Sequence, residues 1–118
     1  MVVTNLSQLR GALSVVINKS TDKRVISARR ALANEIIKDT EDFVPYDTGA
    51  LSSSATVLND GKTIAYTADH AEYVNNMPES YNFDRSIHTQ ATSHWVDASV
   101  TLNRDKWLSN FKKRVGGK

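Results

Sequence analysis

The stretch that decides the fold is Phe43-Val44-Pro45-Tyr46-Asp47-Thr48-Gly49-Ala50-Leu51, which separates a long helical pattern from two short extended segments. A proline disfavours the helical conformation at the residue before it, so the helix must end near Val44. An aspartate side chain can bond backbone groups two residues on, and glycine permits positive φ. We therefore predict a tight turn here, built on Pro45, Asp47, Thr48, Gly49 and Leu51.

Apolar residues upstream of the turn recur at helical spacing over residues 21–43. They lie 3, 4, 4 and 7 positions apart, on one face of a helix: Val25, Ala28, Leu32, Ile36 and Phe43. Residues 5–19 carry a similar pattern, although Gly11 weakens it because glycine is unfavourable inside a helix. We expect helices over about residues 5–43.

Short extended segments follow the turn. Asn59-Asp60-Gly61 follows residues 51–58 and precedes the return segment 63–67, and Asp-Gly between two extended segments is a strong hairpin signal. Residues 71–77 fit a third strand or one helical turn. Residues 81–89 alternate between larger and polar side chains, which fits either a strand or a long ordered loop. Strands are thus expected over about residues 51–90, with the hairpin at 51–67.

The C-terminal part of the sequence is helical again, over about residues 92–114. Thr92 or Ser93 can cap this region, and Asn103 can cap a second segment within it. Helices followed by short strands and then by helices predict an α+β fold, with a small antiparallel sheet and the C-terminal helix packed on it. The length of 118 residues fits a single domain, 1–118.

Composition and charge exclude several classes of protein. The chain has no cysteine, which excludes disulfide scaffolds and thiolate sites, and no apolar run long enough to span a membrane. The net charge is +2, with seven basic and two acidic residues in 1–38 and six basic residues against one acidic residue in 104–118. Two basic ends around an acidic middle fit nucleic acid, acidic partners or head-to-tail self-assembly, or simply a solvated surface with a basic tail.

Residues that could carry chemistry do not form a known catalytic or metal-binding pattern. Histidines occur at 70, 88 and 94 without the spacing of a metal site, and Ser52-Ser53-Ser54 lacks the glycine-flanked context of a hydrolase nucleophile. No glycine-rich phosphate loop is present. We expect no catalytic residue, no metal and no cofactor.

One tetrapeptide, Asp47-Thr48-Gly49-Ala50, is the signature of retroviral-type aspartic proteases, which pair two such aspartates in a homodimer. Those enzymes place the aspartate after an apolar strand in an all-β body, whereas Asp47 follows a long helix and a proline. We therefore interpret the tetrapeptide as a turn and expect no enzymatic activity.

A longer set of motifs resembles a family of tailed-bacteriophage minor capsid and head–tail joining proteins. The first motif is the segment 43–54, with its Pro-x-Asp-Thr-Gly-x-Leu turn after a long helix. It is followed in order by Ile64-Ala65-Tyr66, by His70-Ala71-Glu72-Tyr73-Val74, and by Ala91-Thr92-Ser93-His94-Trp95 at the start of the C-terminal helix. The resemblance covers about residues 20–112.

This resemblance implies a structural role in the virion. Proteins of the family form homo-oligomeric rings in the neck between head and tail, contact portal-side and tail-terminator proteins, and are made in the cytoplasm of the host bacterium. A ring protomer needs two different contact surfaces. Aromatic residues are enriched at interfaces, so the candidate contact residues are Tyr46, Tyr73, Tyr81 and Phe83; ordinary packing against the sheet is the alternative for them.

The basic tail Lys112-Lys113-Arg114 is the candidate surface for DNA in the lumen of such a ring. Contact there must be weak and independent of sequence, because the genome has to slide past. Cations also suit the C-terminal end of a helix, which is an equally simple explanation of the tail. The alternative function, from a different class, is a small basic nucleic-acid-binding protein.

Overall fold

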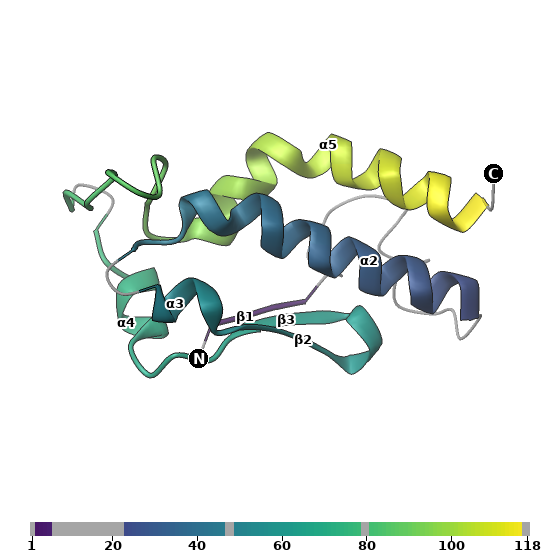
Figure 1. Cartoon of the computed structure of the whole chain (residues 1–118), viewed down its shortest axis with the longest axis horizontal. Coiled ribbons are helices and arrows are strands. Elements are labelled where there is room, and N and C mark those ends of the chain that lie inside the picture. The colour runs from purple at the N-terminus through teal and green to yellow at the C-terminus, as the bar shows by residue number, and fades with distance from the viewer. Residues whose placement is uncertain (1, 6–22, 47–48, 79–80, 117–118) are drawn as a thin grey trace.

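The computed structural model describes residues 2–5, 23–46, 49–78 and 81–116 of the chain. Its elements, in chain order, are β1 (Val2–Asn5), α2 (Lys23–Thr40), the 3-10 helix η2 (Glu41–Phe43), α3 (Ala50–Ser53), β2 (Ala55–Leu58), the 3-10 helix η3 (Asn59–Gly61), β3 (Thr63–Tyr66), α4 (Ala71–Asn75) and α5 (Trp95–Gly116). The two long helices lie together over one face of a small antiparallel sheet (Figure 1). The predicted α+β fold is confirmed.

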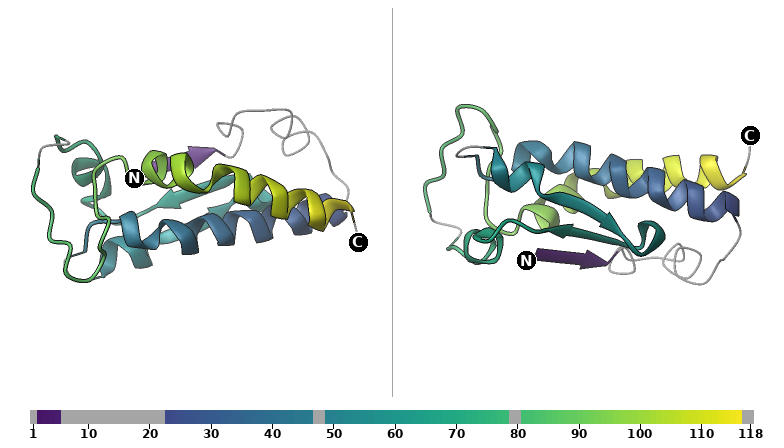
Figure 2. Two further views of the ribbon diagram at one scale, coloured as in Figure 1. Left: turned by 90° about the horizontal axis from the view of Figure 1, so that it is seen from above. Right: turned by 60° about the horizontal axis from the view of Figure 1, so that its bottom comes forward.

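Helices α2 and α5 form an antiparallel pair, seen from above in Figure 2. The face of α2 that the sequence predicts is buried, and η2 continues it with Phe43. Val44 then takes an extended conformation, with ψ of 126°, because Pro45 follows it. From α5 the core receives Trp95, Trp107 and Phe111, all almost fully buried. The helix predicted over 21–43 is therefore confirmed from Lys23 onward.

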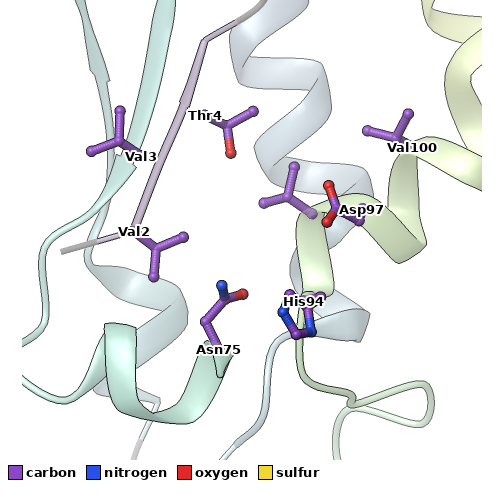
Figure 3. Close-up of a pocket in the computed structure, with 8 residues that line it drawn as sticks. Val2, Val3, Thr4, Asn75, His94, Asp97 and Val100 are labelled. Carbon is purple, nitrogen blue, oxygen red and sulfur yellow. The ribbon is translucent and has the colours of Figure 1, made fainter. Parts of the chain in front are cut away.

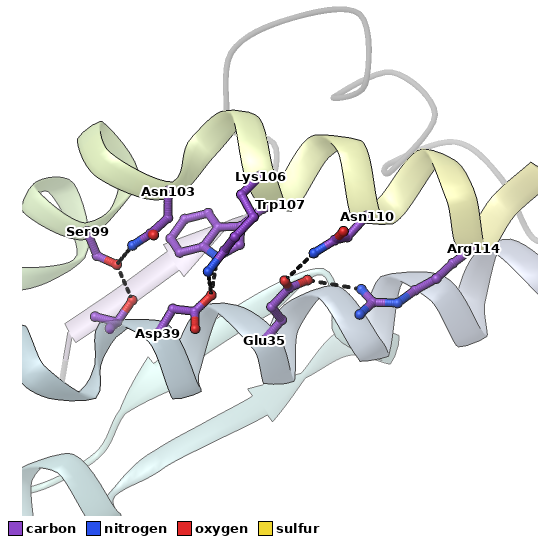
Figure 4. A network of polar contacts seen from close by, with 9 residues as sticks. Glu35, Asp39, Ser99, Asn103, Lys106, Trp107, Asn110 and Arg114 are labelled. Carbon is purple, nitrogen blue, oxygen red and sulfur yellow. Dashed lines mark hydrogen bonds and ion pairs between the residues drawn. The ribbon is translucent and has the colours of Figure 1, made fainter.

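A row of polar side chains joins the two helices along their length (Figure 4). Near one end, the buried Thr40 hydroxyl donates to the Ser99 hydroxyl at 2.8 Å. In the middle, the Asp39 carboxylate accepts a hydrogen bond from Trp107 Nε1 at 2.8 Å. Toward the other end, Glu35 accepts from Asn110 at 2.6 Å. Each of these hydrogen bonds can form only when its two residues lie side by side along the helix axes. The row therefore fixes the register of α5 against α2.

The sheet has the order β1-β3-β2, with both pairs antiparallel. Tyr66 lies opposite Val2 on one side and Ala55 on the other, and all four residues of β3 are buried. The Tyr66 ring meets the Trp95 ring edge-on, with 5.4 Å between centroids. This contact packs the start of α5 on the sheet, as predicted.

The tip of the predicted hairpin is confirmed and rests directly on α2. Asn59, Asp60 and Gly61 all have positive φ, which reverses the chain within three residues. A Cβ at Gly61 would lie only 2.8 Å from the backbone nitrogen of Arg30, so only glycine fits this contact. The close approach fixes the sheet to the helix layer.

The N-terminal prediction is partly wrong. Residues 2–5 form β1, an edge strand that the sequence reading missed, so the helix expected over 5–19 cannot begin at residue 5. Val2-Val3-Thr4 is β-branched throughout, which favours a strand. The rest of that expected helix, residues 6–19, lies outside the described residues.

The strands expected over 51–90 are confirmed only for 55–58 and 63–66. Residues 50–53 form the helical turn α3, in which Ser53 N–H donates to the Gly49 carbonyl at 3.0 Å. Residues 71–75 form α4, so the helical alternative for 71–77 is correct. The described residues between 81 and 92 form an irregular loop rather than a strand, because their polar groups bond to residues 42–44 instead of to a neighbouring strand.

The C-terminal helix is one continuous element rather than two segments. Its first turn is closed by the bond from Ala98 N–H to the His94 carbonyl at 3.1 Å, so the residue at the cap position is His94 rather than Thr92 or Ser93. Asn103 lies inside the helix, where its side chain donates to Ser99 one turn earlier at 3.3 Å. No break at Asn103 is needed, since its amide has a partner on the same helix.

Candidate interaction site

An open groove of about 510 Å³ lies at the end of the molecule where α2 ends and α5 begins. Four segments form it: Pro45 and Tyr46 after η2, Leu51 of α3, the stretch 70–77 that contains α4, and residues 81–84 of the long loop. All four aromatic residues predicted as contact residues line this groove, namely Tyr46, Tyr73, Tyr81 and Phe83. Positions far apart in the sequence are thus brought to one surface, which we call the aromatic groove.

The aromatic residues of the groove differ in exposure. Tyr73 is 73% exposed and Tyr81 is 48% exposed, whereas Phe83 is only 9% exposed. The Tyr81 and Phe83 rings meet edge-on with 4.8 Å between centroids. Phe83, one of the predicted contact residues, is therefore buried and supports Tyr81 rather than offering surface of its own. Tyr73 and Tyr81 are the residues with free surface for a partner.

Three polar contacts to residues 42–44, which we call the clasp, hold the loop that carries Tyr81 and Phe83. The sequence did not predict them. The Asp42 carboxylate accepts hydrogen bonds from the Thr89 N–H at 2.8 Å and from the Thr89 hydroxyl at 2.7 Å. The His88 ring nitrogen Nδ1 lies 2.6 Å from the Val44 carbonyl, and its ring packs edge-on against Tyr46. Partners 44 to 47 positions apart leave no local sequence signal, so the clasp could not be found from spacing.

The groove end carries negative charge. Asp84 lines the groove, and hydrogen bonds from Ser86 hold the pKa of its carboxyl below the ordinary value. The hydroxyl and N–H of Thr89 lower the pKa of Asp42 in the same way, against the opposing effect of burial. Asp69 and Glu72 flank the groove residues His70 and Tyr73 along the chain. Because their pKa values are lowered, the carboxyl groups of Asp84 and Asp42 are ionised at neutral pH.

The predicted turn motif borders the groove. Gly49 has φ of +85°, the left-handed conformation expected of it, and a Cβ there would lie 3.3 Å from the Tyr46 ring. Leu51 is buried in the core and Pro45 lines the groove. Asp47 and Thr48, and with them the tetrapeptide considered as a protease signature, lie outside the described residues.

The opposite end of the molecule is basic. The first two residues of α2, Lys23 and Arg24, lie at the same end as the last turn of α5 (Figure 1). Of the predicted DNA-facing residues, Lys112 and Lys113 are exposed, whereas Arg114 pairs with Glu35 at 3.1 Å. We call this surface, made by the five cations of the two helix ends, the basic end: Lys23, Arg24, Lys112, Lys113 and Arg114.

A smaller pocket of about 250 Å³ lies between β1, the end of α4 and the start of α5 (Figure 3). Its titratable residues are His94 and Asp97, and His94 has φ of +51°, a strained value for a residue other than glycine. Across the part of the chain that the structure describes, no three histidine or acidic side chains come together as a metal site. One histidine and one carboxylate do not supply the nucleophile, base and orienting group of a hydrolase.

Comparison with known proteins places the chain in a structural class. Residues 8–115, nearly the whole chain, match a family described as minor capsid protein. The chain therefore belongs to the minor capsid protein family, and it is a structural protein of the bacteriophage particle. No curated protein and no solved structure matches the chain. Membership in a structural family agrees with the expected lack of catalysis.

No helix in residues 23–46, 49–78 and 81–116, the described part of the chain that holds the helices, is long and apolar enough to span a membrane.

Proposed function

We propose that this protein forms a ring in the neck of the phage particle and joins the tail to the DNA-filled head. The observation that carries the proposal is the gathering of Tyr46, Tyr73, Tyr81 and Phe83 at one end of the molecule. Exposed tyrosines around a concave surface are typical of protein–protein contacts. Family membership and the order of the motifs support the same structural role.

The shape of the protomer suits a ring. The molecule measures 43 × 24 × 20 Å, and its two ends differ in both charge and aromatic content. A contact between unlike surfaces is heterologous, and repeated heterologous contacts close into a ring when the rotation between neighbours allows it. The ring would present its other surfaces to portal-side and tail-terminator proteins.

Deletion of the gene in the source phage tests the proposal directly. We expect electron microscopy of the lysate to show filled heads and separate tails of normal length, because each part assembles but the two cannot join. Restoring the gene on a plasmid should restore joined particles. Normal infectious particles without the gene would refute the neck assignment.

Weak DNA contact at Lys112 and Lys113 remains a prediction, and so does the alternative of a nucleic-acid-binding protein. Both predict that duplex binding weakens as salt rises, because the lysines release counterions from phosphates. The alternative also requires a preference for particular sequences, which a lumen surface must lack. Binding of two unrelated duplexes over a range of salt concentrations separates these two cases.

A further inference from the structure

The aromatic groove and the basic end lie at opposite ends of the 43 Å molecule. We propose that the groove of one copy receives the basic end of a second copy, so that the chains join head to tail. The inference rests on the proposed ring and names the partner that its groove binds.

The groove has the chemistry to bind a cation. The faces of aromatic rings attract lysine and arginine side chains, more strongly where water is excluded. Tyr73 and Tyr81 offer such faces at the rim, and the ionised Asp84 supplies a carboxylate in the same groove. The described residues of the stretch 67–92, which supplies most of the groove, include three acidic residues and one arginine. That arginine, Arg85, is engaged with the Ala91 carbonyl at 3.1 Å.

The basic end carries three exposed lysines that a second copy can contact, namely Lys23, Lys112 and Lys113. The other basic residues near this end include Arg30, which pairs with Asp60, and Arg114, which pairs with Glu35. The N-terminal end of a helix is the positive end of its dipole, so a cation such as Lys23 is unfavourable there. The last turn of α5, which lies at the same end of the molecule, adds the exposed Lys113. An acidic surface on a second copy would offset this unfavourable charge.

The two surfaces are complementary and distinct, as a heterologous contact requires. Each copy offers one groove and one basic end, so every copy in a closed ring has both surfaces filled. The contact combines exposed charges with aromatic faces. It should weaken as salt rises, because ions screen exposed charges beyond about 10 Å at 0.1 M salt.

A mixing experiment on purified full-length chains tests the contact. The groove variant is Tyr73→Ala with Tyr81→Ala, and the end variant is Lys112→Glu with Lys113→Glu; all four side chains are exposed, so the fold should persist. Each variant alone should self-associate at least about tenfold more weakly, since close charge pairs and aromatic anchors at an interface are commonly worth that much or more. A 1:1 mixture should form heterodimers and nothing larger, because it retains one intact groove and one intact basic end per pair.

Lys38→Glu is the matched control for the single reversal Lys113→Glu. Both changes alter the net charge equally, but Lys38 is exposed near the opposite end of α2 and lines neither proposed surface. Only Lys113→Glu should weaken self-association in sedimentation velocity runs. Equal effects of the two reversals would overturn the inference, because net charge alone would then explain them.

Cysteine cross-linking tests the contact inside the particle, where the chain offers a clean background because it has no cysteine. The deleted phage is complemented with Tyr73→Cys plus Lys113→Cys, and oxidised particles should give a ladder of covalent multimers on non-reducing gels. Tyr73→Cys plus Leu102→Cys is the control, since Leu102 is exposed in the middle of α5, and it should give no ladder.

The outcomes separate the inference from the proposed function. If deletion leaves heads and tails apart, but neither the heterodimer nor the ladder forms, the neck role stands and the head-to-tail contact is wrong. If deletion leaves particles normal, the neck role fails, while the mixing experiment still decides the contact. If the end variant loses duplex binding but self-associates like the wild type, the basic end serves DNA and the inference is overturned.

Discussion

The main-chain carbonyl of Asp60, at the tip of the hairpin, accepts a 2.7 Å hydrogen bond from Nε of the buried Arg29 on α2. On the adjacent helical residue, Arg30 pairs with the Asp60 carboxylate at 2.7 Å. The arginine bonds fasten one end of the sheet to the helix layer, and the Tyr66–Trp95 contact fastens the other. These contacts also help to position the groove. Pro45 and Tyr46 follow α2 and η2 in the chain, and the stretch that contains α4 follows β3.

Gly61→Ala should destabilise the protein by about 3 kcal/mol, since positive φ and steric overlap each cost on the order of 1–3 kcal/mol. Gly61 has φ of +87°, and an added Cβ would meet the backbone of Arg29 and Arg30 at 2.8–2.9 Å. Neither α2 nor the hairpin can give way cheaply there, because the close atoms belong to the backbone. Urea denaturation of the variant measures the change, and a loss below about 1 kcal/mol would contradict the tight contact.

Gly49→Val should destabilise the protein by about 2 kcal/mol, because a β-branched residue resists positive φ. The Cβ at Gly49 would lie 3.3 Å from the Tyr46 ring, which can shift, so the cost is smaller than at Gly61. Thermal unfolding of the variant tests the assignment. A melting temperature equal to that of the wild type would show that the left-handed turn is not required.

The local elements of the fold could be predicted from the sequence, whereas the contacts between distant segments could not. The face of α2, the hairpin at Asp60-Gly61 and the C-terminal helix were correctly predicted because period and turn residues are local signals. The strand β1 was missed, since four β-branched or polar residues pair with β3 about 60 positions away. The loop conformation of residues 81–92 could not be predicted for the same reason, because the loop is held by Asp42 and Val44, more than 40 positions away in the sequence.

The candidate site was predictable as a set of residue types but not as a surface. Aromatic residues are common at interfaces, and that general tendency selected Tyr46, Tyr73, Tyr81 and Phe83. Only the fold shows that they share one groove and that the buried Phe83 ring packs against Tyr81. The basic end could not be predicted as a surface either. The start of α2 and the last turn of α5 lie at the same end only because the two helices pair antiparallel.

Thr40→Val and Ser99→Ala should show coupled effects on stability. The Thr40 hydroxyl donates to Ser99 at 2.8 Å inside the helix pair, and both side chains are fully buried. Each single change leaves a buried hydroxyl without this partner and should cost about 1–2 kcal/mol, whereas the double variant should cost less than the sum. A double-mutant cycle measures the difference, and strict additivity would show that the bond is not formed.

Asp39→Asn should lower the free energy of unfolding at neutral pH. The variant should also lose less of this free energy than the wild type when the pH is lowered. Burial raises the pKa of Asp39, but hydrogen bonds from Lys106 and Trp107 and the charge of Lys106 outweigh it, so the pKa lies below 3.8. A carboxyl whose pKa is lower in the folded state adds stability that is present above its unfolded value of 3.8 and is lost as pH falls through its folded value. Denaturation between pH 7 and pH 2 should therefore give a shallower acid slope for the variant. An unchanged slope would contradict an ionised Asp39 held by these bonds.

Asp42→Ala should release the groove loop without disturbing the helix pair. The variant loses both hydrogen bonds to Thr89, and bonds to a charged group are typically worth about 1.5–3 kcal/mol each, so amide exchange in residues 81–92 should accelerate more than tenfold. Thr89→Val is the matched control, because it removes the hydroxyl bond but keeps the N–H bond, and its effect should be intermediate. Hydrogen exchange read by mass spectrometry compares the loop with α2 and α5 in one experiment. If the loop exchanges at the wild-type rate in Asp42→Ala, the clasp does not hold the groove, and the support of Tyr81 must come from the Phe83 contact alone.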